Sequence, residues 1–172
     1  MNRLEPRLWS FYTPDDALFL RDNYIALDDR FAFGDLSSFP AERDAFRACF
    51  DGTVTANVLY RFVHELQIGD CVLLRTEHGA PVELGRVTGD YAYVGGEHRR
   101  SVRWLKRLLF DDISSGAMRE LSYASASPLF EVKRYANEFF AMLGLCVPPA
   151  PQGGTAAERF AARWSAKRKK TA

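Results

Sequence analysis

The chain has 172 residues, of which 47% are hydrophobic and 26% are charged, and its formal net charge is +1. This length and balance suit one globular domain with a buried core and exclude a disordered chain. A net charge so close to zero also excludes a general electrostatic attraction to nucleic acid, so any basic binding face must be local.

Three cysteines, Cys49, Cys71 and Cys146, lie far apart and form no C-x-x-C pair. Their odd number and wide spacing predict free, buried thiols in a reducing compartment, with neither a disulfide framework nor a zinc site. The N-terminus lacks the apolar run of a signal peptide, and no apolar run approaches the roughly 20 residues that a membrane span needs. We therefore expect a cytoplasmic protein without a membrane partner.

The first third of the chain predicts short elements of both kinds. Aromatic alternation and proline mark the first strand and the helix that follows it, and apolar residues at helical spacing mark two later helices. The expected elements are a strand at 8–12, a helix from 14 to about 21, a strand at 23–33 with a turn at Asp28 and Asp29, and helices at 40–50 and 53–66.

The stretch 66–109 carries most of the distinctive residues and predicts three strands joined by two turns. The turns are the glycine- and proline-bearing segments 78–81 and 95–96. Val, Tyr and Trp between such turns are typical of hairpins. The expected strands are at 71–74, 83–94 and 99–109.

The remaining chain predicts helices at 111–121 and 129–145, a Pro/Gly linker at 148–154 and a basic tail or helix at 155–172. One domain over residues 1–147 then precedes the linker. Strands and helices do not alternate regularly, which favours an α+β fold with a small β-barrel flanked by helices.

The third of the predicted central strands is rich in arginine. At a period of two, Arg99, Arg103 and Arg107 share one face, while Val102 and Trp104 lie on the other. Clustered arginines beside aromatic residues predict a face that follows a phosphate backbone, with a core face behind it. The alternative is an ordinary solvated strand.

The middle strand places Tyr91 and Tyr93 on the same face as Gly85, Val87 and Gly89. Glycines leave room for another group, and two tyrosines could form a platform on which a base stacks. The alternative is that both rings pack inside the barrel with their hydroxyls at its rim. A bulge at Gly89 would shift this pattern.

Four further residues allow two interpretations. Trp9 and Tyr12 pack in the core, or one of them lines a pocket. Asp35 and Asp90 each follow a glycine. They cap turns, or they offer a carboxylate to the amine of a base.

Four segments form a pattern that resembles a known family: LYRFV at 59–63, IGD at 68–70, GRVTGDYAY at 85–93 and RRSVRWL at 99–105. Trp9 and GDLS at 34–37 fit it as well. Together they resemble the PUA-like module of the EVE/ASCH type, found at the N-termini of Mrr-type and other modification-dependent restriction endonucleases. The resemblance covers roughly residues 8–145, and its most specific part is G-x-V-x-G-D-Y-x-Y followed by R-x-V-x-W-L.

The resemblance implies a barrel of about five to six strands that binds nucleic acid and holds a flipped, modified base in an aromatic pocket. We expect DNA rather than RNA, no cofactor, and a separately encoded nuclease as partner in restriction or phage defence. Base-pocket candidates are Trp9, Tyr12, Asp35, Asp90, Tyr91, Tyr93 and Trp104, and phosphate-contact candidates are Arg86, Arg99, Arg100, Arg103 and Arg107.

No catalytic or metal-binding residues are predicted. Asp15 and the E-V-K of residues 131–133 spell a PD-(D/E)xK nuclease signature, but both parts fall in predicted helices, more than a hundred positions apart. The histidines show no metal-ligand spacing. We expect a non-enzymatic module. An RNA-binding PUA-like protein and a protein-interaction domain that binds no nucleic acid are the alternatives.

Overall fold

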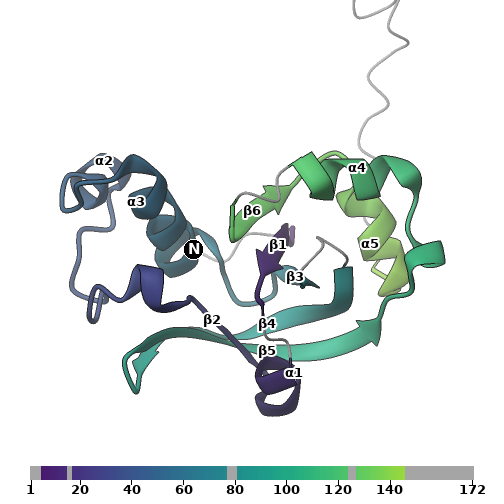
Figure 1. Cartoon of the computed structure of the whole chain (residues 1–172), viewed down its shortest axis with the longest axis horizontal. Helices are drawn as coiled ribbons and strands as arrows, with labels where there is room; N and C mark the ends of the chain where they lie inside the picture. The colour runs from purple at the N-terminus through teal and green to yellow at the C-terminus, as the bar shows by residue number, and fades with distance from the viewer. Residues whose placement is uncertain (1–4, 15–16, 77–80, 124–126, 146–172) are drawn as a thin grey trace, which may run out of the picture.

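Six β-strands form one mixed sheet in the computed structural model of the chain, which describes residues 5–14, 17–76, 81–123 and 127–145 (Figure 1). The strands are β1 (Leu8–Tyr12), β2 (Tyr24–Ala26), β3 (Cys71–Arg75), β4 (Pro81–Val94), β5 (Glu97–Arg107) and β6 (Leu129–Val132). The α-helices are α1 (Ala17–Asp22), α2 (Arg43–Arg47), α3 (Thr53–Tyr60), α4 (Ser115–Tyr123) and α5 (Ala136–Met142). Short helical turns are η1 (Asp29–Phe31) and η4 (Phe110–Asp112), and the π-helical η2 (Arg61–Glu65) continues α3.

The strands follow the order β2-β5-β4-β3-β1-β6 across the sheet. β1 and β3 run parallel, and every other neighbouring pair is antiparallel. β2 and β6 each pair with one neighbour, so the sheet has two edges and is not closed. The predicted α+β class is confirmed, whereas the strand pairing does not show the predicted barrel.

The β4–β5 hairpin has the predicted alternation. From His98 to Arg103, the even-numbered residues of β5 are buried and the odd-numbered ones lie outward. Gly95 and Gly96 close the hairpin with φ of 62° and 91°, a region that favours glycine. The register between β4 and β5 shifts between Val87 and Tyr91, which places a bulge around Gly89.

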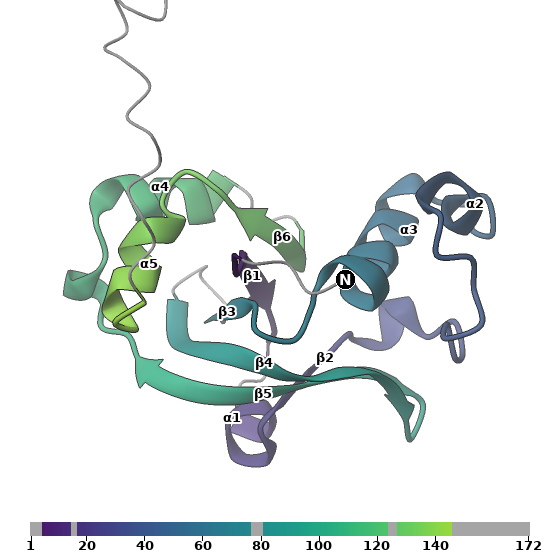
Figure 2. The ribbon, with the colours of Figure 1, turned by 180° about the vertical axis from the view of Figure 1, so that it is seen from behind.

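Two hydrophobic cores lie on opposite faces of the sheet. Trp9 and Val72 belong to a core shared with α3 and η2, while their chain neighbours Leu8 and Cys71 belong to a core shared with α4 and α5. Successive strand residues point to opposite faces, so each strand contributes to both cores. Both views of the ribbon place the α2–α3 pair and the α4–α5 pair at opposite ends of the molecule (Figures 1 and 2).

Two predicted elements were wrong. The segment 129–145 was expected to be one helix, but residues 129–132 form β6, which pairs with β1, and only 136–142 are helical. The strand expected at 23–33 ends at Ala26, and η1 follows it. In the first case pairing with β1 overrides local helix propensity. In the second, Asp28 caps η1 and the extended run ends before it.

The cysteines differ in environment. Cys71 is buried, as predicted, and burial raises the pKa of its thiol to about 11. Cys49 is exposed, contrary to the prediction, and Cys146 lies outside the described residues, as do the linker 148–154 and the tail 155–172. None of the described helices has both the length and the apolar character that crossing a membrane requires.

Candidate functional site

A pocket of about 170 Å³ lies where residues of both edge strands approach the end of β1. Ala26 ends β2 and Pro128 precedes β6, and both line it. We call it the seam pocket. Its walls combine aromatic rings with carboxylates, contributed by Phe11, Tyr12, Phe19, Asp28, Asp29 and Glu97.

The aromatic wall of the seam pocket is packed in place. The ring centroid of Phe19, on α1, lies 6.0 Å from that of the buried Phe11 and 5.2 Å from that of Tyr24. Trp104 Nε1–H donates to the carbonyl of Phe19 at 2.9 Å. A Cβ on Gly85 would lie 2.7 Å from Trp104 Cε3, so glycine permits the indole to lie against β4. Trp104, a pocket candidate, therefore supports the pocket wall through α1 and does not line it.

Tyr12, half-buried, is the predicted candidate that does line the seam pocket. The guanidinium of Arg75 lies 5.9 Å from its ring centroid and 5.0 Å from that of Phe130. Arg75 is fully buried, and its donors bond to Ser10 Oγ and the Ser127 carbonyl. Burial lowers the pKa of Arg75 to about 10. A cation thus supports the tyrosine ring from inside the fold.

The three carboxylates of the pocket differ in their partners. Asp28 accepts two bonds from the Arg30 guanidinium, at 2.6 and 2.9 Å, and these hold the pKa of Asp28 below its usual value. Glu97 accepts from Arg99 at 2.8 Å. The side chain of Asp29 makes no hydrogen bond or ion pair with the part of the chain that the structure describes. Asp29 is therefore the carboxylate left available to a ligand.

His98 anchors the chain segment that carries the pocket's aspartates. Its backbone carbonyl accepts from Leu27 N–H at 3.2 Å, and its Nε2 lies 2.7 Å from the Phe31 carbonyl oxygen. Its Nδ1 lies 2.8 Å from the hydroxyl of Tyr91, which accepts from Leu36 N–H at 3.1 Å. The segment 27–36 is thus tied at several points to the β4–β5 hairpin.

The partners of His98 define its protonation. A carbonyl only accepts, so Nε2 carries the proton and Nδ1 accepts from the Tyr91 hydroxyl. Burial lowers the pKa of His98 and favours this neutral form. Tyr93 packs 5.2 Å from the imidazole, and Asp35 Oδ1 caps Ser37 N–H while lying 3.5 Å from the Tyr91 hydroxyl. Tyr91, Tyr93 and Asp35 thus gather beside the seam pocket without lining it.

Trp9 is a core residue. Its side chain has no exposed surface, and its Nε1–H donates to Asp70 Oδ2 at 2.9 Å. Asp70 also accepts from the backbone N–H groups of Arg7 and Gln67. The indole therefore pairs inside the fold, and a base could not stack on it without opening the core.

Arg100 does not face solvent, contrary to its candidacy for phosphate contact. It is 3% exposed, and its guanidinium donates to the carbonyls of Phe62 at 3.0 Å and Val63 at 2.7 Å. Burial lowers the pKa of Arg100 to about 10. Asp90, by contrast, is exposed and lies 3.9 Å from Arg100 Nη1. Arg100 ties β5 to η2, and its carbonyl partners leave it no role at a phosphate.

Two arginines, Arg86 on β4 and Arg103 on β5, form what we call the outer arginine face. The register shift between Leu84 and Gly85 turns Arg107, predicted to lie on the same face as Arg103, to the other face of the sheet. Arg86 and Arg103 are directly opposite in the sheet register, and Arg107 is opposite Glu83. Arg86 Nε donates to the Gly69 carbonyl at 3.1 Å. Arg103 is exposed and makes no hydrogen bond or ion pair with the described residues. Like charges directly opposite each other destabilise a sheet. An anion bound between Arg86 and Arg103 would relieve that repulsion.

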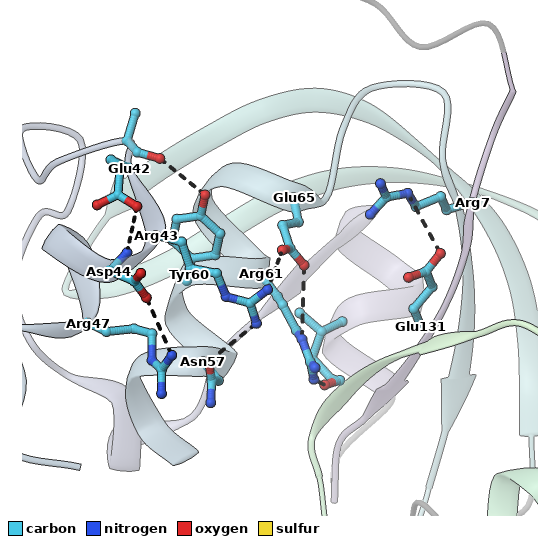
Figure 3. A network of polar contacts seen from close by, with 12 residues as sticks. Arg7, Glu42, Arg43, Asp44, Arg47, Asn57, Tyr60, Arg61, Glu65 and Glu131 are labelled. Carbon is cyan, nitrogen blue, oxygen red and sulfur yellow. Dashed lines mark hydrogen bonds and ion pairs between the residues drawn. The ribbon is translucent and has the colours of Figure 1, made fainter. Parts of the chain in front are cut away.

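A second charged surface has mixed sign. Figure 3 shows Arg7 with Glu131 at 3.7 Å, and Glu65 between Arg43 at 3.5 Å and Arg61 at 4.0 Å. Each of these cations lies beside a carboxylate. The alternation of charge favours the outer arginine face over this surface for contact with phosphates.

A wider, open groove of about 600 Å³ lies beside β6 and α5. Glu131 and Lys133, the residues of the nuclease-like signature, line it and lie 3.5 Å from each other. Asp15, the other part of that signature, lies outside the described residues. Glu131 also faces Arg7, so its charge is balanced by two cations.

Several pocket residues escaped the sequence analysis. Phe11 and Phe19 were assigned only to a strand and a helix, and Asp28 and Asp29 to a turn inside a strand. A useful signal was available, because two adjacent aspartates rarely occupy a strand interior. They follow the end of β2 and line the seam pocket together with the aromatic residues at the end of β1.

Comparisons with known proteins add a family and a distant structural match. A family model described as a domain of unknown function (DUF8426) matches residues 18–127. No curated protein matches the chain. A crystal structure of protein Atu2648 from Agrobacterium tumefaciens, a structural genomics target, matches with 13% identity and a TM-score of 0.42, covering 83% of this chain and 97% of that one.

Proposed function

The chain belongs to the family of domains of unknown function DUF8426, and we propose that it is a non-catalytic module that binds DNA and reads a modified base. The base leaves the duplex and enters the seam pocket. The observation that carries the proposal is the pocket itself, which joins three aromatic side chains to an unpaired carboxylate. In this proposal the six-stranded sheet is a PUA-like barrel left open at the seam.

The free energies of base extraction, stacking and methyl burial indicate which part of such a module would supply affinity and which would supply selectivity. Extracting a base costs a few kcal/mol, and stacking it on an aromatic ring returns roughly 1–3 kcal/mol. One buried methyl group adds about 0.8 kcal/mol, which is roughly a fourfold preference. The seam pocket therefore supplies selectivity, and contacts to the phosphate backbone must supply most of the affinity.

The outer arginine face is the proposed source of that affinity. Arg103 is exposed, opposite Arg86 and without a carboxylate partner among the described residues. Each phosphate contact releases counterions, so binding weakens steeply as salt rises. Arg99 contributes less, because Glu97 already neutralises it.

The module itself is proposed to be non-catalytic, with a separately encoded nuclease as its effector in the cytoplasm. Both ring nitrogens of His98 are occupied by partners inside the fold, which leaves no base available there for a substrate. A nuclease that acts with such a reader would cut only where the reader is bound.

Fluorescence anisotropy tests the proposal. Labelled duplexes carry cytosine, 5-methylcytosine or N6-methyladenine at one position, beside an RNA duplex, at two salt concentrations. We expect DNA binding that weakens with salt and a modest preference for one modified duplex. A preference for RNA would favour an RNA-binding PUA-like protein. Binding of neither at low salt would refute the proposal and favour a protein-interaction domain, for which the groove beside β6 is the available surface.

A further inference from the structure

We propose that Asp29 determines which bases the seam pocket accepts, by taking a hydrogen bond from an exocyclic amine. This inference rests on the proposed function and narrows it. The ligand is then an amine-bearing base, modified or not, and thymine and uracil are rejected.

The first step concerns the availability of the pocket's carboxylates. Arg30 binds Asp28 with two bonds, the shorter at 2.6 Å, and Arg99 binds Glu97 at 2.7 Å. Asp29 lines the same pocket, and its carboxylate has no partner among the described side chains. Of the three acids, Asp29 alone has no cationic partner among the described residues, so a ligand amine would meet no competing cation at its carboxylate.

The second step concerns its placement. Asp28 caps η1 by accepting from Arg30 N–H at 3.0 Å, which fixes the backbone on both sides of Asp29. His98 then holds this segment at Leu27 and at Phe31, through its carbonyl and its ring. The backbone of Asp29 is thus held while its side chain is not, as a recognition group requires.

The third step concerns chemical complementarity. An ionised carboxylate only accepts hydrogen bonds, so the facing group must donate. Cytosine, adenine and guanine carry exocyclic amines, whereas thymine presents a carbonyl oxygen in that place. A carbonyl placed against the carboxylate sets two acceptors facing each other, and neither gains the hydrogen bond that an amine would supply.

A cationic ligand is the competing occupant, because rings and carboxylates also bind ammonium groups. The pairing of Asp28 and Glu97 with arginines favours the base. With two of its three acids neutralised, the pocket carries about one uncompensated negative charge rather than three. A neutral amine needs one acceptor, and one is what the pocket offers.

The test measures affinity for four duplexes, each with a different target base opposite an abasic site, so that no base pair has to break. We compare the natural protein with Asp29→Asn and Asp29→Ala, and use Asp51→Asn as a control that removes one exposed carboxylate elsewhere. We expect amine-bearing targets to bind roughly tenfold tighter than thymine, since a hydrogen bond to a charged group has about that effect. Both Asp29 variants should lose most of this ratio, and Asp51→Asn should keep it.

Three results would overturn the inference. A preference that survives both Asp29 variants would assign it to other residues. Binding of all four targets with equal affinity would refute base selection by Asp29 while leaving DNA binding intact. Direct binding of a trimethyllysine peptide that is lost in the Asp29 variants, together with no binding of any duplex, would identify a cation site and would refute the proposed function as well.

Discussion

Tyr91 donates its hydroxyl proton to Nδ1 of His98 across 2.8 Å, and this bond joins β4 to β5 beside the segment that carries the pocket's aspartates. The same hydroxyl accepts from Leu36 N–H, and Nε2 of the imidazole donates to the Phe31 carbonyl. Tyr91, which the sequence predicts as part of a platform for base stacking, therefore supports the pocket from behind and does not line it.

Removing the Tyr91 hydroxyl tests that support. Tyr91→Phe leaves Leu36 N–H and His98 Nδ1 without their partner, so we expect the free energy of unfolding to fall by about 1–3 kcal/mol. Urea denaturation measures it. Tyr93→Phe is the matched control, because its hydroxyl makes no hydrogen bond with the described residues, and it should change stability by less than about 0.5 kcal/mol. Equal losses of stability in the two variants would contradict a stabilising role for the hydrogen bonds of the Tyr91 hydroxyl.

The protonation of His98 predicts a pH dependence. Burial lowers its pKa from the ordinary value of 6.5, so the unfolded chain binds this proton more readily than the folded one. Stability is therefore fully present above about pH 6.5 and falls as the pH drops from there toward the folded pKa. His64, whose pKa burial also lowers, acts in the same direction. NMR titration of the imidazole signals should place His98 below 6.5; a value above it would contradict the neutral, buried form.

Arg103→Ala separates phosphate contact from folding. Arg103 is exposed and has no partner among the described residues, so stability should change by less than about 0.5 kcal/mol. Binding should weaken for all duplexes alike, and the slope of log K against log salt should become less steep by about one unit. Anisotropy over a salt series measures both. An unchanged slope would remove Arg103 from the interface.

Arg100→Met, by contrast, should lower the free energy of unfolding. The guanidinium of Arg100 is the donor for the carbonyls of Phe62 and Val63, which would lose these bonds inside the fold. We expect a loss of about 2–4 kcal/mol in unfolding free energy. Arg103→Met provides the matched substitution at an exposed site on the same strand. Comparable stability of the two variants would show that the buried bonds contribute little.

The sequence predicts the hairpin better than the pocket, for a physical reason. Alternation along β5 is local, and it placed Arg103 outward and Val102 inward as observed. The same alternation put Arg100 on the inward face, so its candidacy for phosphate contact could have been rejected from the pattern alone.

The seam pocket depends on pairings between distant segments. β6 pairs with β1 across more than a hundred residues, and its sequence also has the apolar spacing of a helix. Trp9 could not be assigned to the core until Asp70 was seen to accept from its indole. Tyr12 and Trp9 were named together as aromatic residues of the first strand, and the sequence alone did not separate the pocket residue from the core residue.

An NMR titration of the ¹⁵N-labelled chain with a duplex that holds one extrudable base tests the central claim most directly. The account predicts shifts of the amide signals at residues 26–29 and at Arg86 and Arg103. With an otherwise identical duplex that has an abasic site in place of the target base, the shifts at 26–29 should vanish and those at the two arginines should persist. Shifts at 26–29 that are the same with both duplexes, or shifts confined to the groove beside β6, would contradict base recognition in the seam pocket.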